Sequence, residues 1–302
     1  MNNGNMKSEK GSKKFTAQGD CYMDIRQMIR SDLDFAVFCT ETEGWDSEVR
    51  EVFEGFHTFF PGGCFIAEEE DKPAGIVVAT SYADHGFIGE LIVLHRYRGR
   101  GIGTALFRRA VDVLRERGVR TILLDGDLKA VPIYERGGFR RLCRSLRFNG
   151  SIRGCMSGSI RPMSVKDLVA ISQIDREIFG DDRSFFLEDC LRNYPGYCLV
   201  EEKKGRVTGY LFGRKGRGLI AAGPWAVLPG GEPMAMLESL SCVADGISLR
   251  IGVLENNLEA TRFMRSLHGF DEEEYSWRME WGLPSDLGDN PCLFGIGSPA
   301  RG

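Results

Sequence analysis

This sequence of 302 residues lacks an apolar run of the roughly 18 residues that a helix needs to cross a membrane. Residues 1–20 are polar and lysine-rich, with no apolar stretch of the kind found in a secretory leader. Both absences predict a cytoplasmic protein with no membrane partner. A formal net charge of -4 also excludes a general attraction to nucleic acid, so any basic site has to be local.

Cysteine is present, but without the spacing of a metal or disulfide site. The nine cysteines are scattered from Cys21 to Cys292, include no C-x-x-C pair and do not cluster with the four histidines. We interpret them as reduced, mostly buried side chains and predict no bound metal. A reactive thiol is the alternative, and no cysteine stands beside a base or a helix-start signal that would support it.

The length predicts two domains, because the chain is too long for one compact domain of ordinary size. Residues 1–20 carry almost nothing to bury and are predicted to form a disordered tail. The next segments alternate in periodicity, which predicts a mixed α/β sheet with helices on both faces. The expected helices span residues 31–38, 46–60, 104–117 and 131–136, and the expected strands span residues 64–67, 74–79, 87–94 and 121–124.

The second half of the sequence repeats this order. A helix is predicted at residues 165–179, with a hairpin of strands at 198–201 and 207–212, and the closing segments 130–139 and 260–270 are similar. We therefore predict tandem domains joined by a Gly/Ser-rich linker at residues 149–158. Their expected bounds are 21–150 for the first domain, 159–282 for the second and 283–302 for a C-terminal extension.

A glycine-rich turn, residues 98–104, joins the strand at 87–94 to the following helix. Glycines let backbone N–H groups approach an anion closely, and a helix N-terminus adds positive potential. Arg98 and Arg100 place charge beside it. The pattern predicts a pyrophosphate site, with a tight loop bearing solvated arginines as the alternative. A dinucleotide site is not expected, because G-x-G-x-x-G is absent.

The spacing Arg98-x-x-Gly101-x-Gly103 resembles the coenzyme A signature of the GNAT superfamily of N-acetyltransferases. A second motif on the next helix is similar to the same superfamily at Ala130, Tyr134, Glu135, Gly138 and Phe139. Three shorter motifs, at residues 43–45, 87–89 and 124–126, resemble a tandem-GNAT group with a divergent second domain. The resemblance covers nearly the whole chain.

This resemblance implies an α/β fold of two tandem GNAT-like domains, each a mixed, mainly antiparallel sheet with helices on both faces. It implies acetyl-CoA as co-substrate, held in the first domain. The residues that it implies for coenzyme binding are Leu91, Ile92, Val93, Arg98, Gly99, Arg100, Gly101, Ile102, Gly103, Thr104, Asp127 and Ala130.

Direct acyl transfer from a thioester to an amine needs a base for the amine and an acid for the leaving thiolate. By the resemblance, Tyr134 occupies the usual position of the acid; a core tyrosine is the alternative. The strand positions where family members often carry a base hold Phe87 and Gly89. Glu90 is one residue out of phase and points away from the amine unless a bulge intervenes. Asp125, at the end of a buried strand, competes with it as base or amine anchor.

Two further features have open interpretations. Trp45 stands at a helix start where the superfamily's substrate-covering helices lie, so it forms either a wall of the acceptor pocket or part of the core. The arginines of the strand after residue 139 form either a solvated face, which we favour, or a dock for an acidic substrate. They are Arg140, Arg141, Arg144 and Arg147.

The second domain lacks the chemistry of the first. Its equivalent turn contains Pro229 and Glu232, which remove N–H donors and add the wrong charge for a phosphate. Met264 stands at the tyrosine position, while Asn257 and Ala260 keep the coenzyme-side pattern, so residual coenzyme binding stays open. We favour a structural or substrate-completing role.

The function predicted from these features is N-acetyl transfer from acetyl-CoA to a primary amine of a small molecule or peptide. The alternative is a non-catalytic acyl-CoA sensor, to which the missing strand carboxylate would point. An acyltransferase for longer chains is a third hypothesis. The sequence leaves the oligomeric state open.

Overall fold

The structure is a computed structural model that describes residues 13–16 and 22–302. The first half contains strands β1 to β7 and helices α1 to α4, and its elements follow the predicted order. Their bounds are β1 Lys13–Thr16, β2 Tyr22–Gln27, α1 Leu33–Thr42, α2 Arg50–Phe59, β3 Cys64–Glu69, β4 Lys72–Ser81, β5 His85–Val93, α3 Ile102–Glu116, β6 Thr121–Gly126, α4 Val131–Arg136 and β7 Arg140–Gly150.

The second half repeats the order, as predicted, and adds strands near its C-terminal end. The bounds are β8 Ile160–Pro162, α5 Leu168–Phe179, α6 Ser184–Asn193, β9 Cys198–Lys203, β10 Arg206–Lys215, β11 Leu219–Val227, α7 Pro233–Ala244, β12 Ser248–Leu254, α8 Leu258–Ser266, β13 Phe270–Glu272, β14 Ser276–Gly282 and β15 Leu293–Gly295. Within the predicted tail, residues 13–16 form β1 against β2; the rest of that prediction lies outside the described residues.

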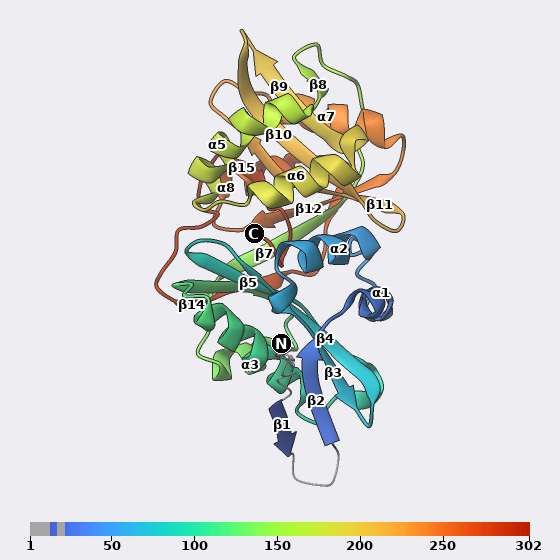
Figure 1. The fold of residues 1–302 in the computed structure, drawn as a ribbon. Helices are drawn as coiled ribbons and strands as arrows, with labels where there is room; N and C mark the ends of the chain where they lie inside the picture. The colour runs from blue at the N-terminus through green and yellow to red at the C-terminus, as the bar shows by residue number, and fades with distance from the viewer. Residues whose placement is uncertain (1–12, 17–21) are drawn as a thin grey trace, which may run out of the picture.

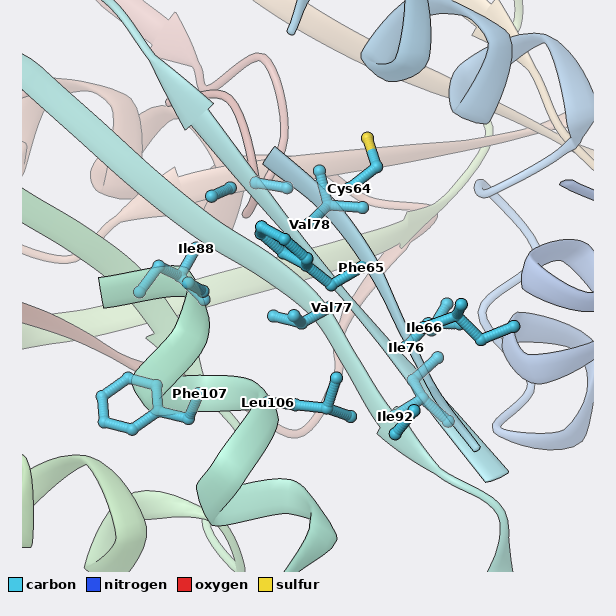
Figure 2. Packing of buried hydrophobic residues seen from close by; sticks show 14 of the residues in the cluster. Cys64, Phe65, Ile66, Ile76, Val77, Val78, Ile88, Ile92, Leu106 and Phe107 are labelled. Atoms are coloured by element: carbon cyan, nitrogen blue, oxygen red, sulfur yellow. The ribbon is translucent and has the colours of Figure 1, made fainter. Parts of the chain in front are cut away.

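Each half packs its sheet between helices. In the first half, α3 covers strands β3 to β5 with an apolar stripe that includes Leu106 and Phe107. Figure 2 shows these two side chains on α3, in the same cluster of buried residues as Val77 of β4 and Ile88 of β5. The helices α1 and α2 cover the same sheet from the other side (Figure 1). In the second half, α5 and α6 lie on one face and α7 and α8 on the other.

The two halves exchange their closing strands. The strand order is β1-β2-β3-β4-β5-β6-β14-β7-β12-β11-β10-β9-β8, so β14 of the second half lies between β6 and β7 of the first. Residues 145–150 of β7 in turn pair with β12, from Ser145 opposite Leu254 to Gly150 opposite Leu249. One sheet therefore runs through both halves, and the boundaries expected at residues 150 and 282 divide the sequence rather than the sheet.

The C-terminal segment returns to the junction of the halves, as the position of the chain end in Figure 1 shows. Ala300, Arg301 and Gly302 are buried there. Arg301 lies over the rings of Phe56 in α2 and Phe186 in α6, at 4.0 Å and 4.7 Å from their centres, and donates to the carbonyl of Val52 at 2.8 Å. The predicted extension is thus part of the interface between the halves.

Candidate active site

The glycine turn has the backbone conformation that its sequence predicts. Gly99 and Gly101 have φ values of +78° and +83°, a region that residues with a side chain rarely adopt, and a β-carbon at either position would meet only open space. Helix α3 begins directly afterwards at Ile102. Its first N–H groups therefore point out of the helix start toward space that an anion can occupy.

The two arginines of the turn point in different directions. The Arg98 Nε atom donates to the Val93 carbonyl at 2.8 Å, and its guanidinium pairs with Glu43 at the end of α1. Arg100 pairs with Glu69 at 2.6 Å and is not among the residues that line the cavity described next. The structure therefore brings Arg98 to the site and leaves Arg100 beside it.

A cavity of about 690 Å³ opens between β5 and β6. These two strands are parallel and paired only from His85–Thr121 to Ile88–Leu124, and β5 continues without β6 beyond that point. The remaining site residues expected from the sequence all line the cavity, namely Trp45, Glu90, Leu91, Ile92, Val93, Arg98, Gly99, Gly101, Ile102, Gly103, Thr104, Asp125, Asp127, Ala130 and Tyr134.

Glu90 faces this cavity because β5 has a bulge. Ile92 lies opposite Ile76, but Gly89 lies opposite Val78, so Glu90 and Leu91 together face the single residue Val77. Glu90 itself has a φ of +51°, which marks the bulged position. The extra residue reverses the alternation that would otherwise turn the carboxylate away.

The surroundings of Glu90 favour its neutral form. Only 6% of the residue is exposed, and its Oε2 atom has no hydrogen-bond partner in the part of the chain that the structure describes. Burial raises the pKa of Glu90 well above its ordinary value, and the nearby Glu48 raises it further. The charges of Arg301 and Arg214 act in the opposite direction. Such a carboxylate accepts a proton more readily than an exposed one.

The two strand positions where a base was expected have structural roles. Phe87 is fully buried and stacks on Phe179 of the second half at 6.2 Å between ring centres. Gly89 lies against Ala300, and a β-carbon on Gly89 would come within 2.2 Å of the Ala300 β-carbon. Both positions are therefore occupied by contacts between the halves, which leaves Glu90 as the carboxylate of this strand that reaches the cavity.

Tyr134 lies in α4 with its ring packed edge-on against Phe107, 5.2 Å between centres. Gly126 makes room for it, because a β-carbon there would come within 2.9 Å of the Tyr134 ring. Burial, with a smaller effect from Asp127, raises the pKa of Tyr134. The phenol is therefore protonated at neutral pH and can donate a proton.

Asp125 does not have the surroundings of a base. Its Oδ1 accepts from Arg278 of β14, and its Oδ2 accepts from Arg147 at 2.9 Å and from Ser145 at 2.7 Å. These partners outweigh its burial and lower the pKa of Asp125 to about 2. A carboxylate so stabilised as an anion is a poor proton acceptor.

The loop between α1 and α2 is held by the second half. Arg217, in the turn between β10 and β11, donates to the carbonyls of Trp45 at 2.8 Å and Glu48 at 3.1 Å. Its backbone N–H also donates to the Asp46 carbonyl at 2.8 Å. The Trp45 side chain is half-buried and lines the cavity beside this contact.

The strand arginines are mostly engaged in ion pairs. Arg140 pairs with Glu280, Arg141 with Glu135, and Arg144 with Glu255, all at least partly exposed to solvent. Arg147 alone of the four lines the cavity. The interpretation as a solvated face thus describes the outer three.

Sequence reasoning missed the residues that the second half contributes to the cavity. They are Arg214, Ala221, Ala222, Arg250, Gly252 and residues 273–276 and 296–299. No local pattern marks them, because they come to the cavity only through the packing of one half on the other. The first half also contributes lining residues that were not predicted although they are close in sequence to predicted ones, among them Glu48, Tyr97 and Ile133.

Comparisons with known proteins agree with this architecture. A model described as the acetyltransferase (GNAT) family matches residues 26–139, and one described as an acetyltransferase (GNAT) domain matches residues 171–295. The chain belongs to the GNAT acetyltransferase family. It is an acyltransferase with tandem GNAT domains.

Curated relatives of this GNAT protein match part of its length. N-alpha-acetyltransferase 30 of Schizosaccharomyces pombe is 29% identical over 133 residues, 41% of this chain and 81% of the relative. N-alpha-acetyltransferase MAK3 of Arabidopsis thaliana is 33% identical over 112 residues, 33% of this chain and 58% of the relative. Mouse thialysine N-epsilon-acetyltransferase is 25% identical over 162 residues, 47% of this chain and 94% of the relative.

Solved structures share the fold over nearly the whole chain. A candidate acetyltransferase of Pyrococcus horikoshii has a TM-score of 0.78 at 24% identity, covering 99% of this chain and 100% of that one. A tandem GNAT protein from the clavulanic acid biosynthesis pathway has a TM-score of 0.60 at 14% identity, covering 87% and 100%. These likenesses concern the arrangement of the two GNAT domains.

The second GNAT domain fills its own cleft. Strands β11 and β12 are paired up to Ala222 and Ile251, and beyond that point β15 pairs with β11 at Trp225 and Ala226. The Ile296 N–H then donates to the Gly252 carbonyl at 2.9 Å. The chain itself thus occupies the gap that corresponds to the cavity of the first domain.

The residues of this domain that keep the coenzyme-side pattern, Asn257 and Ala260, help to hold the segment that fills the gap between β11 and β12. The Asn257 side-chain amide donates to the carbonyls of Asn290 and Leu293 at 3.0 Å and 2.7 Å, and its oxygen caps the Ala260 N–H at 3.1 Å. Met264, at the tyrosine position, is buried in the core. These contacts explain the surviving pattern without a coenzyme.

The described residues offer neither a helix long and apolar enough to cross a membrane nor a group of three or more side chains arranged to hold a metal ion.

Proposed function

We propose that the chain transfers an acetyl group from acetyl-CoA directly to a primary amine of a small molecule or peptide, with the active site in its N-terminal domain. One observation carries this proposal. The bulge in β5 places Glu90 in the same cavity as Tyr134 and the glycine turn. A proton acceptor, a proton donor and an anion-binding turn therefore share one site.

The residues of the first domain fit acetyl-CoA. Gly99 and Gly101 leave open space at the start of α3, where N–H groups would bind the pyrophosphate, and Arg98 adds a positive charge there. The edge of β5 beyond Ile88 has no β6 partner and is free to bind the pantetheine arm. Bound acetyl-CoA supplies the thioester carbonyl that the amine attacks.

The proton steps fall to two side chains. Glu90, whose pKa is raised by burial and by Glu48 and which is therefore a stronger base than an exposed carboxylate, accepts the proton of the amine directly or through water. Tyr134 keeps its proton in the ground state because its pKa is raised, and it donates to the thiolate as charge develops there. Asp125 holds Arg278 and Arg147 in place, and Trp45 forms a wall of the acceptor pocket.

The sensor alternative depended on a missing strand carboxylate, and the bulge at Glu90 removes that argument. The names of the relatives, N-alpha-acetyltransferases and a thialysine N-epsilon-acetyltransferase, support an amine acceptor. A cytoplasmic location stays part of the proposal and can be tested by microscopy of a tagged chain.

The test is thiol release from acetyl-CoA over a panel of peptide amino termini, alkylamines and amino sugars, with the acetylated product identified by mass spectrometry. The Gly101→Glu variant is the control that lacks a usable pyrophosphate site. Acetyl-CoA binding by the wild type without acetylation of any amine would contradict the proposal and favour the sensor.

A further inference from the structure

A row of side chains crosses the sheet of the second domain and forms one wall of the cavity. Arg214 of β10 lies opposite Ala221 of β11, Ala221 opposite Arg250 of β12, and Arg250 opposite Asn149 of β7. Residues that face one another across neighbouring strands point to the same side of a sheet. Arg214 and Arg250 therefore stand on the same face with only the small Ala221 between them.

A third arginine extends this basic wall. Arg147 lies opposite Gly252 of β12, two positions along from Arg250, and thus on the same face. All three arginines line the cavity, as do Ala221 and Gly252. Ala221 and Gly252, which lie between the guanidinium groups, are small and leave space in the cavity that larger side chains would fill.

The three arginines differ in their partners. Arg147 pairs with Asp125 at 2.9 Å, and Arg250 pairs with Glu273 at 3.2 Å. Arg214 forms no ion pair within the described part of the chain, and its one hydrogen bond goes to the Gly297 carbonyl at 3.1 Å. Its Nε and Nη1 atoms have no partner although only 3% of the residue is exposed.

A buried guanidinium with unused donors is costly, because those N–H groups have lost water without gaining an acceptor. Arg301 is buried nearby and adds positive charge rather than compensating for it. Arginine binds carboxylate and phosphate oxygens through its N–H groups, and Arg214 retains unused donors on two of its three nitrogens.

Carboxylates of the first domain line the same cavity. Glu48, in the loop before α2, and Glu90, in β5, both line it and are both buried. A ligand that spans the cavity thus meets carboxylates for an amine from one domain and an unpaired guanidinium from the other. This is the charge pattern of a small molecule with an amine and an acid group.

We propose that the acceptor is a small primary amine that also carries an anionic group, and that Arg214 binds that group. The inference rests on the proposed acetyl transfer and adds the class of substrate. Arg214 is thus a binding residue supplied by the domain that fills its own cleft, which gives the second domain a role in selecting the acceptor.

The test uses the full chain with acetyl-CoA and matched sets of amines: L-amino acids, the corresponding amino-acid amides, and amino sugars with and without a phosphate. Thiol release gives kcat and KM for the wild type and for Arg214→Met and Arg214→Lys. Arg161→Met is the matched control, because Arg161 pairs with Asp167 on the surface of the same domain, away from the cavity. The melting temperature of each variant is measured in parallel.

We expect the anionic member of a matched pair to have a kcat/KM about tenfold or more above its neutral counterpart, as for a charge-assisted contact. Arg214→Met should abolish this preference through KM. Its effect on Glu90, whose pKa Arg214 lowers, is common to both amines and does not change their ratio. Arg214→Lys keeps the positive charge but lacks the planar guanidinium with its several N–H donors, so it should retain part of the preference for the anionic amine. The carboxylate and phosphate sets show which anion is bound.

Equal use of neutral and anionic amines, or a preference that survives in Arg214→Met, would overturn the inference and leave the proposed acetyl transfer standing. A loss of rate in Arg214→Met that is equal for neutral and anionic amines would also overturn it, since Arg214 would then serve only to offset Glu90. Failure of every amine to release thiol would refute the acetyl transfer itself. If Arg214→Met does not fold, the selectivity of Arg214→Lys decides.

Discussion

Asp125 of the first domain and Arg278 of the second form a buried ion pair on neighbouring strands. Arg278 belongs to β14, the strand that the second half inserts beside β6, and it lies directly opposite Asp125 in the register. The two residues are 1% and 2% exposed in their side chains. Asp125 also lines the cavity, so one residue of the pair that fixes the exchanged strand forms part of the cavity wall.

We predict that Asp125→Asn destabilises the protein by roughly 3–5 kcal/mol at neutral pH, because Arg278 would remain buried without its counter-charge. The pKa of Asp125 is lowered to about 2, so its stabilisation is present above the ordinary carboxyl pKa and is lost as the pH falls through about 2. The difference from wild type should therefore shrink over that acidic range. Urea unfolding at several pH values measures it.

Glu255→Gln is the control for this prediction, because Glu255 forms a more exposed pair with Arg144. It should change stability by about 1 kcal/mol or less. An Asp125→Asn variant as stable as this control would show that the buried pair contributes little.

The glycine turns of the two domains provide a matched pair of substitutions. Gly101 and Gly230 have φ values of +83° and +91°, and a β-carbon at either position meets only open space. A glutamate therefore brings similar backbone strain to both. We predict that Gly101→Glu abolishes acetyl-CoA binding by charge repulsion, whereas Gly230→Glu leaves it unchanged; calorimetric titration decides.

Arg98→Glu should likewise abolish binding, since Arg98 lines the cavity. Undiminished affinity in Gly101→Glu and Arg98→Glu would remove the N-terminal site. Loss of affinity in Gly230→Glu as well would instead mean that strain or a second site is involved.

The sequence predicted most elements of the first half, and in the second half the helix at 165–179, the hairpin strands at 198–201 and 207–212 and the closing segment at 260–270, because their signals are local. The positions of Gly99 and Gly101, the apolar stripe of α3 and the hairpin at β3 and β4 each depend on neighbouring residues. Strand exchange was not predictable in the same way. Nothing in the alternation of residues 140–150 or 276–282 states which strand each will pair with, because either partner buries the same face.

The residues of the candidate site also differ in whether a local signal in the sequence predicts them. The residues of one strand, turn and helix were predicted, and all but Arg100 line the cavity. Arg214, Arg250 and the segment at 296–299 come from distant parts of the chain and were not predicted. Glu90 is intermediate. The alternation of side chains along a strand predicts that the Glu90 side chain points away from the cavity. The bulge opposite Val77 makes it point into the cavity. A bulge of this kind leaves little trace in a sequence without a marker glycine.

Glu90→Gln should lower kcat strongly and remove the rise of activity with pH. In the wild type this rise should occur above the ordinary carboxyl pKa, because burial and Glu48 raise the pKa of Glu90 more than Arg301 and Arg214 lower it. Initial rates from acidic to alkaline pH, with any accepted amine, test this. A pH profile unchanged in Glu90→Gln would assign the proton to solvent or another group.

The same substitution has a predicted effect on stability. A carboxyl group with a raised pKa disfavours folding once it ionises, so its cost is absent below the ordinary carboxyl pKa and grows as the pH rises toward the raised value. Glu90→Gln should therefore raise the melting temperature at neutral and alkaline pH and leave it nearly unchanged in acid. A melting temperature lowered at neutral pH would instead give Glu90 a structural role.

Tyr134→Phe should lower kcat by about 10²–10⁴-fold and leave acetyl-CoA affinity close to wild type. The hydroxyl acts only as charge develops on the departing thiolate, so its loss appears in the transition state and hardly in ground-state binding. The ring contacts with Phe107 and Gly126 are unchanged by the substitution, which keeps the position of α4.

A core role for Tyr134 would give the opposite pattern. Removing a buried hydroxyl that only stabilises the fold would lower the melting temperature and spare the rate per folded molecule. Measuring kcat, coenzyme affinity and melting temperature of Tyr134→Phe together therefore separates the two roles. Because the raised pKa keeps the phenol protonated, wild-type activity should not fall at mildly alkaline pH through loss of this proton. Full turnover in Tyr134→Phe would move the assignment to water as the proton source.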